Sequence, residues 1–288
     1  MRYAIITNPV CGGMNIDEKR SYLAKAAEIL EAEIHGLDTE TLDDFKRCAR
    51  DLVKRCDVLV AAGGDGTFSE VVNAIDTSQR LLAYLPLGTG NAMQYALQYK
   101  GNLVDIATRI KKGKIHQCDL IKCDGKKLAF MASIGIDGTI IRLRDQYLAQ
   151  GETGFKTYLK AAFRASFSQY KRFKATITVD GTSSEVDNLL SVMVVKQPYY
   201  GFAMNVVPMA RFNDRQLHIL YINSGLFMSL VGIGTAFTIG NRAGKYRTGQ
   251  KVSLHLDRPV LLQIDGNPAW EDDAFTFMVM DGAMKLKY

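Results

Sequence analysis

The sequence is poor in the residues that build disulfide frameworks and histidine-based metal centres. It contains five cysteines and no C-x-x-C pair, and its four histidines show no H-E-x-x-H spacing. An odd cysteine count without paired spacing argues against a disulfide framework and favours a reducing compartment, the cytoplasm. The histidine spacing argues against a zinc site of the metalloprotease type.

Long apolar segments are also scarce. The longest uncharged run, residues 224–240, contains four glycines and lies at the lower length limit for a bilayer span, so a buried helix is predicted there. Residues 1–10 are too short in their apolar part for a signal peptide and are expected to form a first strand. No basic segment is interleaved with aromatic residues in the manner of single-strand binders, so no nucleic-acid partner is expected.

What the sequence does contain is a regular alternation in its first 120 residues. Short apolar runs at residues 3–8, 57–62 and 81–86 alternate with segments of helical periodicity. Wholly apolar strands between helices are typical of a parallel sheet that is covered on both faces. The formal net charge of +6 fits an anionic partner such as a nucleotide or a phospholipid headgroup. We therefore predict an α/β nucleotide-binding domain over residues 1–120.

The second part of the chain, residues 121–288, has a different pattern. Asp-Gly pairs recur at residues 124–125, 180–181, 265–266 and 281–282, among runs that alternate between apolar and polar residues. Such pairs are typical of β-hairpins. The pattern predicts a mostly antiparallel β domain that is interrupted by one strong helix within residues 154–173.

Three glycine-bearing turns follow the predicted strands of the first domain. They are N-P-V-C-G-G at residues 8–13, G-G-D-G-T at 63–67 and P-L-G-T-G-N at 86–91. Glycines after a parallel strand let backbone N–H groups approach a phosphate, and the next helix adds a favourable dipole. Asp65 in the second turn would repel a phosphate unless a cation lay between them, which indicates a Mg²⁺-nucleotide.

These turns supply the predicted ATP-binding residues, which we list together with one threonine from the segment D-T-E-T-L-D-D: Asn8, Gly12, Thr39, Gly63, Gly64, Gly66, Thr67, Gly88, Thr89, Gly90 and Asn91. The alternative interpretation of Thr39 is a helix cap. The turns match neither the P-loop pattern nor the dinucleotide-binding pattern G-x-G-x-x-G.

Taken together, these motifs resemble the diacylglycerol kinase catalytic-domain family, which includes sphingosine and ceramide kinases and bacterial lipid kinases. The resemblance extends to the segments A-S-I-G-I-D-G-T-I-I and V-L-L-Q-I-D-G-N-P-A-W of the second part. It implies an α/β domain with a parallel sheet, followed by a β-sandwich-like domain, with the active site in the cleft between them. It also allows the last strand to return to the first domain.

The resemblance further implies an ATP- and Mg²⁺-dependent lipid kinase of phospholipid biosynthesis. Such an enzyme transfers the γ-phosphate to a hydroxyl of a diacylglycerol-like or sphingoid-like lipid. In this chain Asp65 would be catalytic and would position Mg²⁺, Asp265 would act as the catalytic base, and Asp119 would join the metal-linked network.

The chain departs from the family pattern at several positions. Arg215 and His218 replace a glycine and an aspartate of a metal-binding segment, so Asp214 is the one side-chain candidate left there. Ala92 and Asn267 replace an aspartate and a glutamate, which favours a catalytically weak lipid- or nucleotide-binding protein as an alternative. NAD kinase, which shares the G-G-D-G turn, is the other alternative, although the Asn-Glu pair that it would need is missing from the corresponding region.

The predicted helix of the second domain also indicates a membrane partner. Lys156, Lys160 and Arg164 are spaced to form one basic stripe, and a basic amphipathic helix can dock on an anionic bilayer. The sequence therefore predicts a cytoplasmic protein that associates peripherally with a membrane, where its lipid substrate lies. A homodimer is compatible with the sequence.

Overall fold

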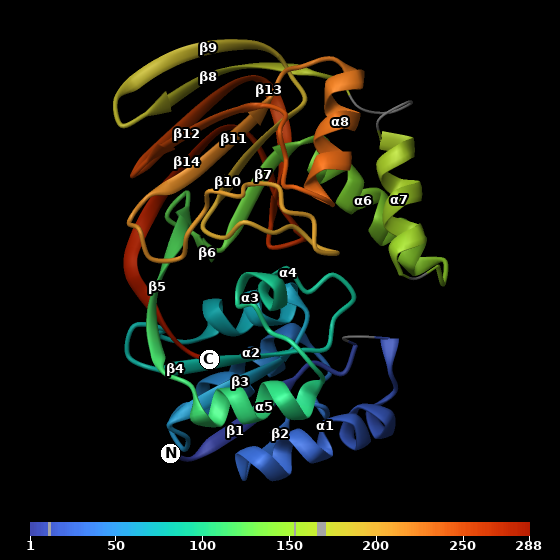
Figure 1. Cartoon of the computed structure of the whole chain (residues 1–288), viewed down its shortest axis with the longest axis vertical. Helices are drawn as coiled ribbons and strands as arrows, with labels where there is room; N and C mark the ends of the chain where they lie inside the picture. Colours follow the sequence, from blue (N-terminus) through green and yellow to red (C-terminus); the bar gives the residue numbers. More distant parts are fainter. Residues whose placement is uncertain (11–12, 153, 166–170) are drawn as a thin grey trace. The chain divides into compact units, whose positions relative to one another are not determined.

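The structure is a computed structural model that describes residues 1–10, 13–152, 154–165 and 171–288. The chain forms two compact units (Figure 1). Unit 1 consists of Met1–Asp119 together with Asp281–Tyr288, and unit 2 consists of Leu120–Met280. Within the described ranges, no helix combines the length and the apolar character that a membrane crossing requires.

Unit 1 is an α/β layer structure. Its elements are β1 (Tyr3–Thr7), α1 (Ile16–Leu30), β2 (Glu33–His35), α2 (Leu42–Leu52), β3 (Val58–Gly63), α3 (Asp65–Ala74), β4 (Leu81–Pro86), α4 (Ala92–Ala96) and α5 (Leu103–Lys112). The strands are parallel in the order β2-β1-β3-β4. The end of β14 (Asn267–Lys287) adds a further parallel strand beside β4.

Both faces of this sheet are covered. All six residues of β3 are buried, as wholly apolar strands require when helices pack on each side. Helices α1 and α5 lie side by side, and α2 and α3 form a second pair (Figure 1). Helices α1, α2 and α5 begin at capping boxes, as Asn15 and Glu18 show for α1. The predicted α/β domain with a parallel sheet is confirmed.

Unit 2 is built mainly from antiparallel strands. Its elements are the end of β5 (Ile115–Cys123), β6 (Lys127–Ala129), β7 (Met131–Gly135), α6 (Ile136–Ala149), α7 (Phe155–Arg164), β8 (Phe173–Val179), β9 (Thr182–Leu189), β10 (Ser191–Val195), β11 (Leu217–Ile222), α8 (Leu226–Ala236), β12 (Lys245–Gly249), β13 (Lys251–Ile264) and the first part of β14. The order is β12-β11-β10-β7-β13, and β13 also pairs with β8 and β14. One core cluster draws apolar side chains from most of these strands.

Three of the four Asp-Gly pairs form tight turns, as predicted. Both residues of each pair have a positive φ at 124–125, 180–181 and 265–266, which Asp and Gly adopt readily. The prediction of a hairpin at 281–282 is wrong, because these two residues lie inside the long strand β14. There the chain passes from unit 2 back into unit 1.

The helices of unit 2 differ from the prediction in two ways. The sequence predicted helices within residues 154–173 and 224–240, whereas the structure also contains α6, whose first turn is the motif segment around Asp137. The helix predicted within residues 224–240 is present as α8, but it is not buried along its whole length. Ala236 is 3% exposed, whereas Met228 and Ile233 on this helix are 44% and 50% exposed. An uncharged sequence therefore lies at the surface of unit 2.

Candidate functional site

The second and third glycine turns contact each other in unit 1. Strand β3 ends at Gly63, and Leu87 N–H, just after β4, donates to Gly63 O at 2.9 Å. A Cβ added to Gly88 would lie 2.5 Å from Gly64 Cα, closer than side chains allow. Gly64 and Gly88 are therefore needed so that two backbones can pack together. The second and third glycine turns therefore lie against each other.

Asp65 fastens one turn to the other. It is the first residue of α3, and its two carboxylate oxygens accept hydrogen bonds from Ala92 N at 2.8 Å and Met93 N at 2.9 Å. These amides open α4, which has no side-chain cap of its own. Burial raises the pKa of Asp65 above its ordinary value, and the two N–H donors act in the opposite direction. The observed role of Asp65 is to hold the second and third glycine turns together.

Asn91 closes the third turn on itself. Its side-chain amide donates to Gly88 O at 2.6 Å, and its Oδ1 accepts from Gly88 N at 3.0 Å. Tyr84 OH adds a third hydrogen bond to the same oxygen at 3.1 Å. Thr89 is exposed and Gly90 is partly exposed. The turn is thus held from within while Thr89 and Gly90 face outward.

The start of α3 also presents backbone donors. Gly64 is its N-cap residue and provides no side-chain hydrogen bond. Gly66 and Thr67, in the first turn, are partly exposed. A Cβ on Gly63 would lie 2.5 Å from Thr67 Cβ, so glycine is also required here. Amides at a helix N-terminus without a side-chain cap are suited to bind an anion.

The first glycine turn is held by a lysine that the sequence interpretation missed. Lys19 on α1 is fully buried, and its ammonium donates to Asn8 O and Pro9 O, both at 2.8 Å. Asn8 Oδ1 accepts from Val10 N at 3.0 Å, so this side chain also shapes the turn. The signal in the sequence was a lysine at an apolar position of the helical pattern of α1. Gly12 lies outside the described residues.

Thr39 stabilises a turn rather than a helix. Its hydroxyl donates to Gly36 O at 2.7 Å. The cap of α2 is Thr41, which accepts from Asp44 N at 3.1 Å. The alternative interpretation of Thr39 as a helix cap is therefore wrong, and its contact with a nucleotide stays a prediction.

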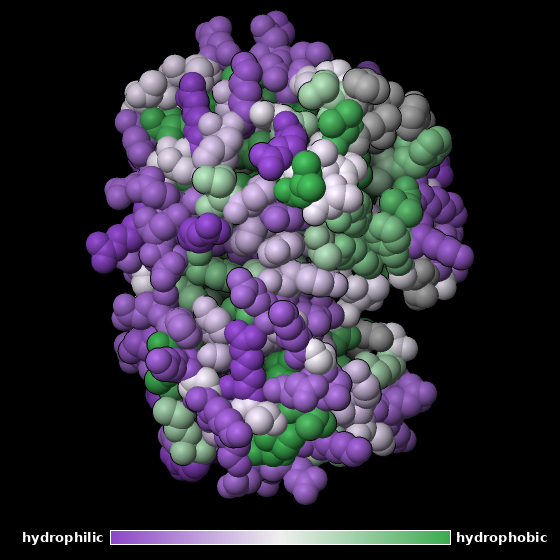
Figure 2. Space-filling model, viewed as in Figure 1, coloured by the Kyte–Doolittle hydropathy of each residue, from purple (hydrophilic) through white to green (hydrophobic). Residues whose placement is uncertain are grey.

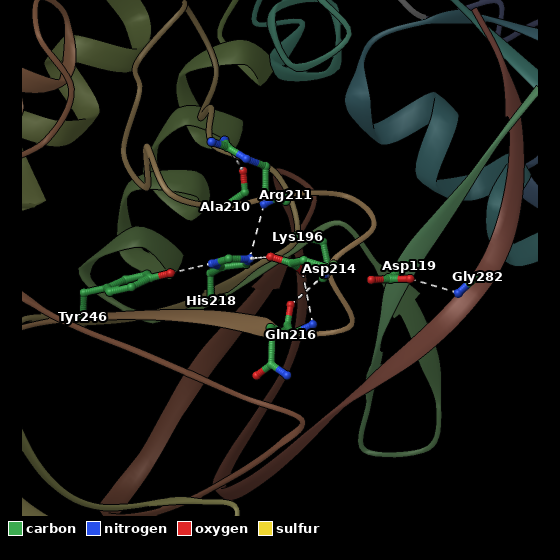
Figure 3. A network of polar contacts seen from close by, with 9 residues as sticks. All are labelled: Asp119, Lys196, Ala210, Arg211, Asp214, Gln216, His218, Tyr246 and Gly282. Carbon is green, nitrogen blue, oxygen red and sulfur yellow. Dashed lines mark hydrogen bonds and ion pairs between the residues drawn. The ribbon is translucent and has the colours of Figure 1, made fainter. Parts of the chain in front are cut away.

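Asp119 anchors the end of the chain in unit 1. Its side chain is buried, and Oδ1 accepts from Gly282 N at 2.9 Å (Figure 3). Thr77 OH donates to the neighbouring Ala283 O at 2.6 Å. The observed role of Asp119 is therefore to fix the returning strand β14, and its place in a metal-linked network stays a prediction.

Asp265 occupies the tight turn between β13 and β14 in unit 2. The residue is 7% exposed, and its Oδ1 accepts from Phe130 N at 3.0 Å and Met131 N at 2.9 Å. Gln263 supports the same turn, because its Oε1 accepts from Gly266 N at 2.8 Å. Gln263 was not predicted, although a glutamine within the apolar run V-L-L-Q-I was a signal.

The residues around Asp214 do not fit a divalent metal. The carboxylate accepts from the buried ammonium of Lys196 at 2.6 Å and from Gln216 N at 3.2 Å (Figure 3). His218 Nε2 lies 2.8 Å from the other carboxylate oxygen. A positive charge is thus already bound at the carboxylate where a metal was predicted.

Two domain families match the chain in sequence. Residues 2–123 match the diacylglycerol kinase catalytic domain, and residues 131–286 match the YegS C-terminal NAD kinase beta sandwich-like domain. A diacylglycerol kinase of Staphylococcus saprophyticus is 24% identical over 275 residues, which cover 92% of this chain and 88% of that protein. An uncharacterized protein of Synechocystis is 24% identical over 235 residues, which cover 76% of this chain but only 53% of that longer protein.

Solved structures show the same fold. The crystal structure of a diacylglycerol kinase from Bacillus anthracis superposes with a TM-score of 0.71 at 19% identity, covering 100% of this chain and 96% of that chain. An NAD kinase from Archaeoglobus fulgidus, solved in complex with ATP, gives a TM-score of 0.53 at 14% identity, with 100% and 94% covered. These matches confirm the fold class predicted from the sequence.

The two domain matches follow each other along the chain and together span most of it. They also agree with the lipid-kinase class that the motifs indicated. The chain therefore belongs to the family that joins a diacylglycerol kinase catalytic domain to a YegS C-terminal NAD kinase beta sandwich-like domain, and its enzyme class is that of a lipid kinase.

Proposed function

We propose that this protein transfers the γ-phosphoryl group of ATP to a hydroxyl of a diacylglycerol-like or sphingoid-like lipid, with Mg²⁺ as the cofactor. The observation that carries this proposal is the pair of glycine turns after β3 and β4, fastened to each other by Asp65. Phosphoryl transfer depends mainly on positioning and on neutralising charge, and rigid backbone donors provide the first of these. The shared fold of an NAD kinase that was solved with ATP supports nucleotide binding here.

The residues of unit 1 fit a nucleotide phosphate. The amides of Gly66 and Thr67 would bind phosphate oxygens at the start of α3, and Thr89 and Gly90 would contribute from the neighbouring turn. Bound Mg²⁺ would supply neutralising charge. This ion commonly takes only one or two protein carboxylates and completes its shell with phosphate oxygens and water, so Asp65 suffices as the protein ligand.

In unit 2, Asp265 is proposed as the base that accepts the proton of the lipid hydroxyl. Its carboxylate is held by two backbone amides, and its turn is held by Gln263, so its position is fixed before substrate arrives. A positioned general base contributes about 10²–10⁴-fold to the rate.

We also propose that unit 2 contacts an anionic lipid surface through α7 and α8. Leu159 and Phe163 on α7 are 48% and 67% exposed, and they lie next to the exposed stripe of Lys156, Lys160 and Arg164. Hydrophobic residues gather over α7 and α8 (Figure 2). Apolar side chains beside basic ones suit the boundary between headgroups and acyl chains. The protein would thus act at the cytoplasmic face of a membrane.

A labelling experiment tests the proposed function. The protein is incubated with γ-labelled ATP, Mg²⁺ and a total lipid extract, and labelled products are identified by mass spectrometry. A labelled lipid monophosphate is expected. Label in NADP when NAD is supplied would establish the NAD kinase alternative instead. Binding of ATP without transfer to any lipid would establish the catalytically weak binding protein.

Asp65→Asn and Asp65→Ala sharpen this test. Both carboxylate oxygens accept N–H groups of α4, so Asp65→Asn keeps one acceptor and Asp65→Ala keeps none. Both variants should therefore lower the melting temperature, Asp65→Ala by more, at about 1–3 kcal/mol for each unpaired amide. If the charge of Asp65 acts on Mg²⁺, Asp65→Asn abolishes transfer, whereas it retains part of the transfer if the carboxylate serves chiefly as an acceptor. Wild-type transfer by Asp65→Ala would contradict the proposed site.

A further inference from the structure

Lys196 is a completely buried lysine in unit 2, placed directly after β10. Its backbone N–H donates to Phe130 O at 2.8 Å. Its ammonium donates to Asp214 Oδ1 at 2.6 Å and to Gln216 O at 2.7 Å (Figure 3). Lysine is almost never fully buried unless it is paired, because the ammonium loses its hydration. The hydrogen bonds of the ammonium must therefore offset the cost of burying it.

The partners of Lys196 belong to the segment that leads into β11. Asp214 also accepts from Gln216 N at 3.2 Å, and its second oxygen lies 2.8 Å from His218 Nε2. Arg211 N–H points at the same ring nitrogen at 3.2 Å, and Tyr246 OH on β12 lies 2.7 Å from Nδ1 (Figure 3). The network thus connects the segment between β10 and β11 with β11, through His218, and with β12, through Tyr246.

The acceptors that meet at Lys196 are of the kinds that a hard cation uses. Mg²⁺ and Ca²⁺ bind carboxylate and backbone carbonyl oxygens, and they need six or more ligands. Here a carboxylate of Asp214 and the carbonyl of Gln216 converge on one ammonium. Across the residues that the structure describes, no group of three histidine, cysteine, aspartate or glutamate side chains is arranged to hold a metal.

The ammonium of Lys196 and a divalent metal ion cannot occupy this site together. An ammonium within 2.6–2.7 Å of both oxygens occupies the space that a metal ion would need. A divalent ion would also be strongly repelled at such short range in a buried site. Either the lysine or a metal can neutralise this site, and the chain carries the lysine.

We propose that the ammonium of Lys196 is the built-in cation that holds residues 211–216 onto the sheet of unit 2, so that this unit requires no divalent metal for its stability. A covalently attached charge makes the segment independent of the metal concentration. This proposal does not rest on the proposed kinase activity, because it concerns the folding of unit 2 alone.

The first test uses the wild-type protein without nucleotide. After treatment with EDTA, addition of millimolar Mg²⁺ or Ca²⁺ should move its melting temperature by less than about 1 °C, because unit 2 has no metal site and the Mg²⁺ proposed for unit 1 binds together with the nucleotide. Hydrogen exchange of the Arg211 and Gln216 amides, both donors in the network, should be unaffected by EDTA. A metal-dependent rise that Asp214→Asn abolishes would overturn the proposal.

The second test removes the charge. Lys196→Met keeps an unbranched side chain, one atom shorter, but leaves the Asp214 carboxylate without its cation. Lys196 is fully buried but the Asp214 side chain is 30% exposed, so loss of the charge-assisted hydrogen bond should lower the melting temperature by about 3–10 °C. Relative to the wild type, hydrogen exchange at the Arg211 and Gln216 amides should become faster, whereas exchange at amides of β8 and β9 should change less.

Lys174→Met is the matched control. Lys174 lies in the same unit and pairs with Asp187 at 3.1 Å, but both side chains are at least 70% exposed. Its loss should change the melting temperature by no more than about 2 °C. A Lys196→Met protein that matches this control would overturn the proposal. If Lys196→Met does not fold, the metal titration of the wild-type protein still decides the question.

Discussion

Single residues fix the backbone of the candidate nucleotide site before any ligand binds. Asp65 joins two turns, Asn91 closes one of them, and the buried Lys19 holds the turn after β1. Each side chain satisfies backbone groups that would otherwise need water. When the donors of a site are already oriented, no free energy is spent on orienting them as the ligand binds. Phosphoryl transfer depends on such positioned donors.

Gly88→Ala is expected to damage the site more than Gly64→Ala. The added Cβ at Gly88 would meet Gly64 Cα at 2.5 Å, whereas the one at Gly64 would meet Gly88 Cα at 3.3 Å. Overpacking of this kind costs about 1–3 kcal/mol, and the Gly88 variant should lie at the upper end. The stabilisation by ATP and Mg²⁺ in a melting experiment should be lost for Gly88→Ala and only reduced for Gly64→Ala.

Thr89→Ala, which changes an exposed residue next to Gly88, is the control for stability. Equal stability of all three variants would contradict the packing argument.

His218 is expected to make unit 2 less stable in weak acid. Burial lowers the pKa of His218 below its ordinary value, against the opposing effect of Asp214. The unfolded chain therefore binds the proton first, so the stability from neutral His218 is complete above about pH 6.5 and is lost as the pH falls towards the folded-state pKa. His218→Gln should flatten the loss of unfolding free energy between about pH 7 and pH 5.

The pH measurement needs a control variant, and Asp214 has to be excluded as the group that causes the pH dependence. His255→Gln changes an exposed histidine of the same unit and should leave the wild-type slope in place. The pKa of Asp214 is lowered despite its burial, because Lys196 donates to it and carries positive charge, so Asp214 titrates below this window. An unchanged slope in His218→Gln would show that another group causes the acid sensitivity.

At the scale of elements, the sequence predicted the positions of strands and turns better than it predicted which side chains are buried. The apolar runs and three Asp-Gly turns follow from local chemistry, since both residues of such a turn tolerate a positive φ. The exposure of α8 does not follow from local chemistry, because an uncharged run is equally suited to a core and to a membrane surface. The partners of Lys19 and Lys196 could not be predicted, because the backbone carbonyls and the carboxylate that accept from them are brought near only by the fold.

The basic stripe of α7 is expected to bind anionic vesicles. Changing Lys156, Lys160 and Arg164 together to Gln should weaken binding about 10–100-fold at low salt, since each charge near such a surface is worth about 1 kcal/mol. The effect should be smaller than additive, because Lys160 also pairs with Glu152. Sedimentation with vesicles of defined anionic content measures it, and transfer to a soluble short-chain lipid should be preserved.

The control for α7 is a triple change of equal charge in unit 1. Arg50, Lys54 and Arg55 are exposed residues at the end of α2 and just after it. Their replacement by Gln should leave vesicle binding close to wild type. If both triples weaken binding equally, the attraction comes from net charge and not from a surface on α7.

At the scale of the whole molecule, the chain does not divide into two consecutive segments. A boundary near residue 120 was expected from the change in sequence pattern, and Leu120 does begin unit 2. The last eight residues, Asp281–Tyr288, nevertheless belong to unit 1. Sequence pattern alone could not place them, because a short β-strand can pair with any free sheet edge. The resemblance to a family allowed this return, and the hydrogen bonds of Asp119 and Thr77 fix it.

Unit 1 should therefore depend on the end of the chain for its stability. Leu286 is fully buried and pairs with Leu82 at the edge of the parallel sheet. Leu286→Ala should cost about 2–5 kcal/mol, as deletions in a core do. Because the loss falls on one unit, amides of β3 and β4 should exchange faster in hydrogen-exchange mass spectrometry, while those of β10 keep their protection. Met278→Ala, at a 40% exposed position of the same strand in unit 2, is the control. If exchange in β3 and β4 is unchanged in Leu286→Ala, the returning segment covers unit 1 without stabilising it.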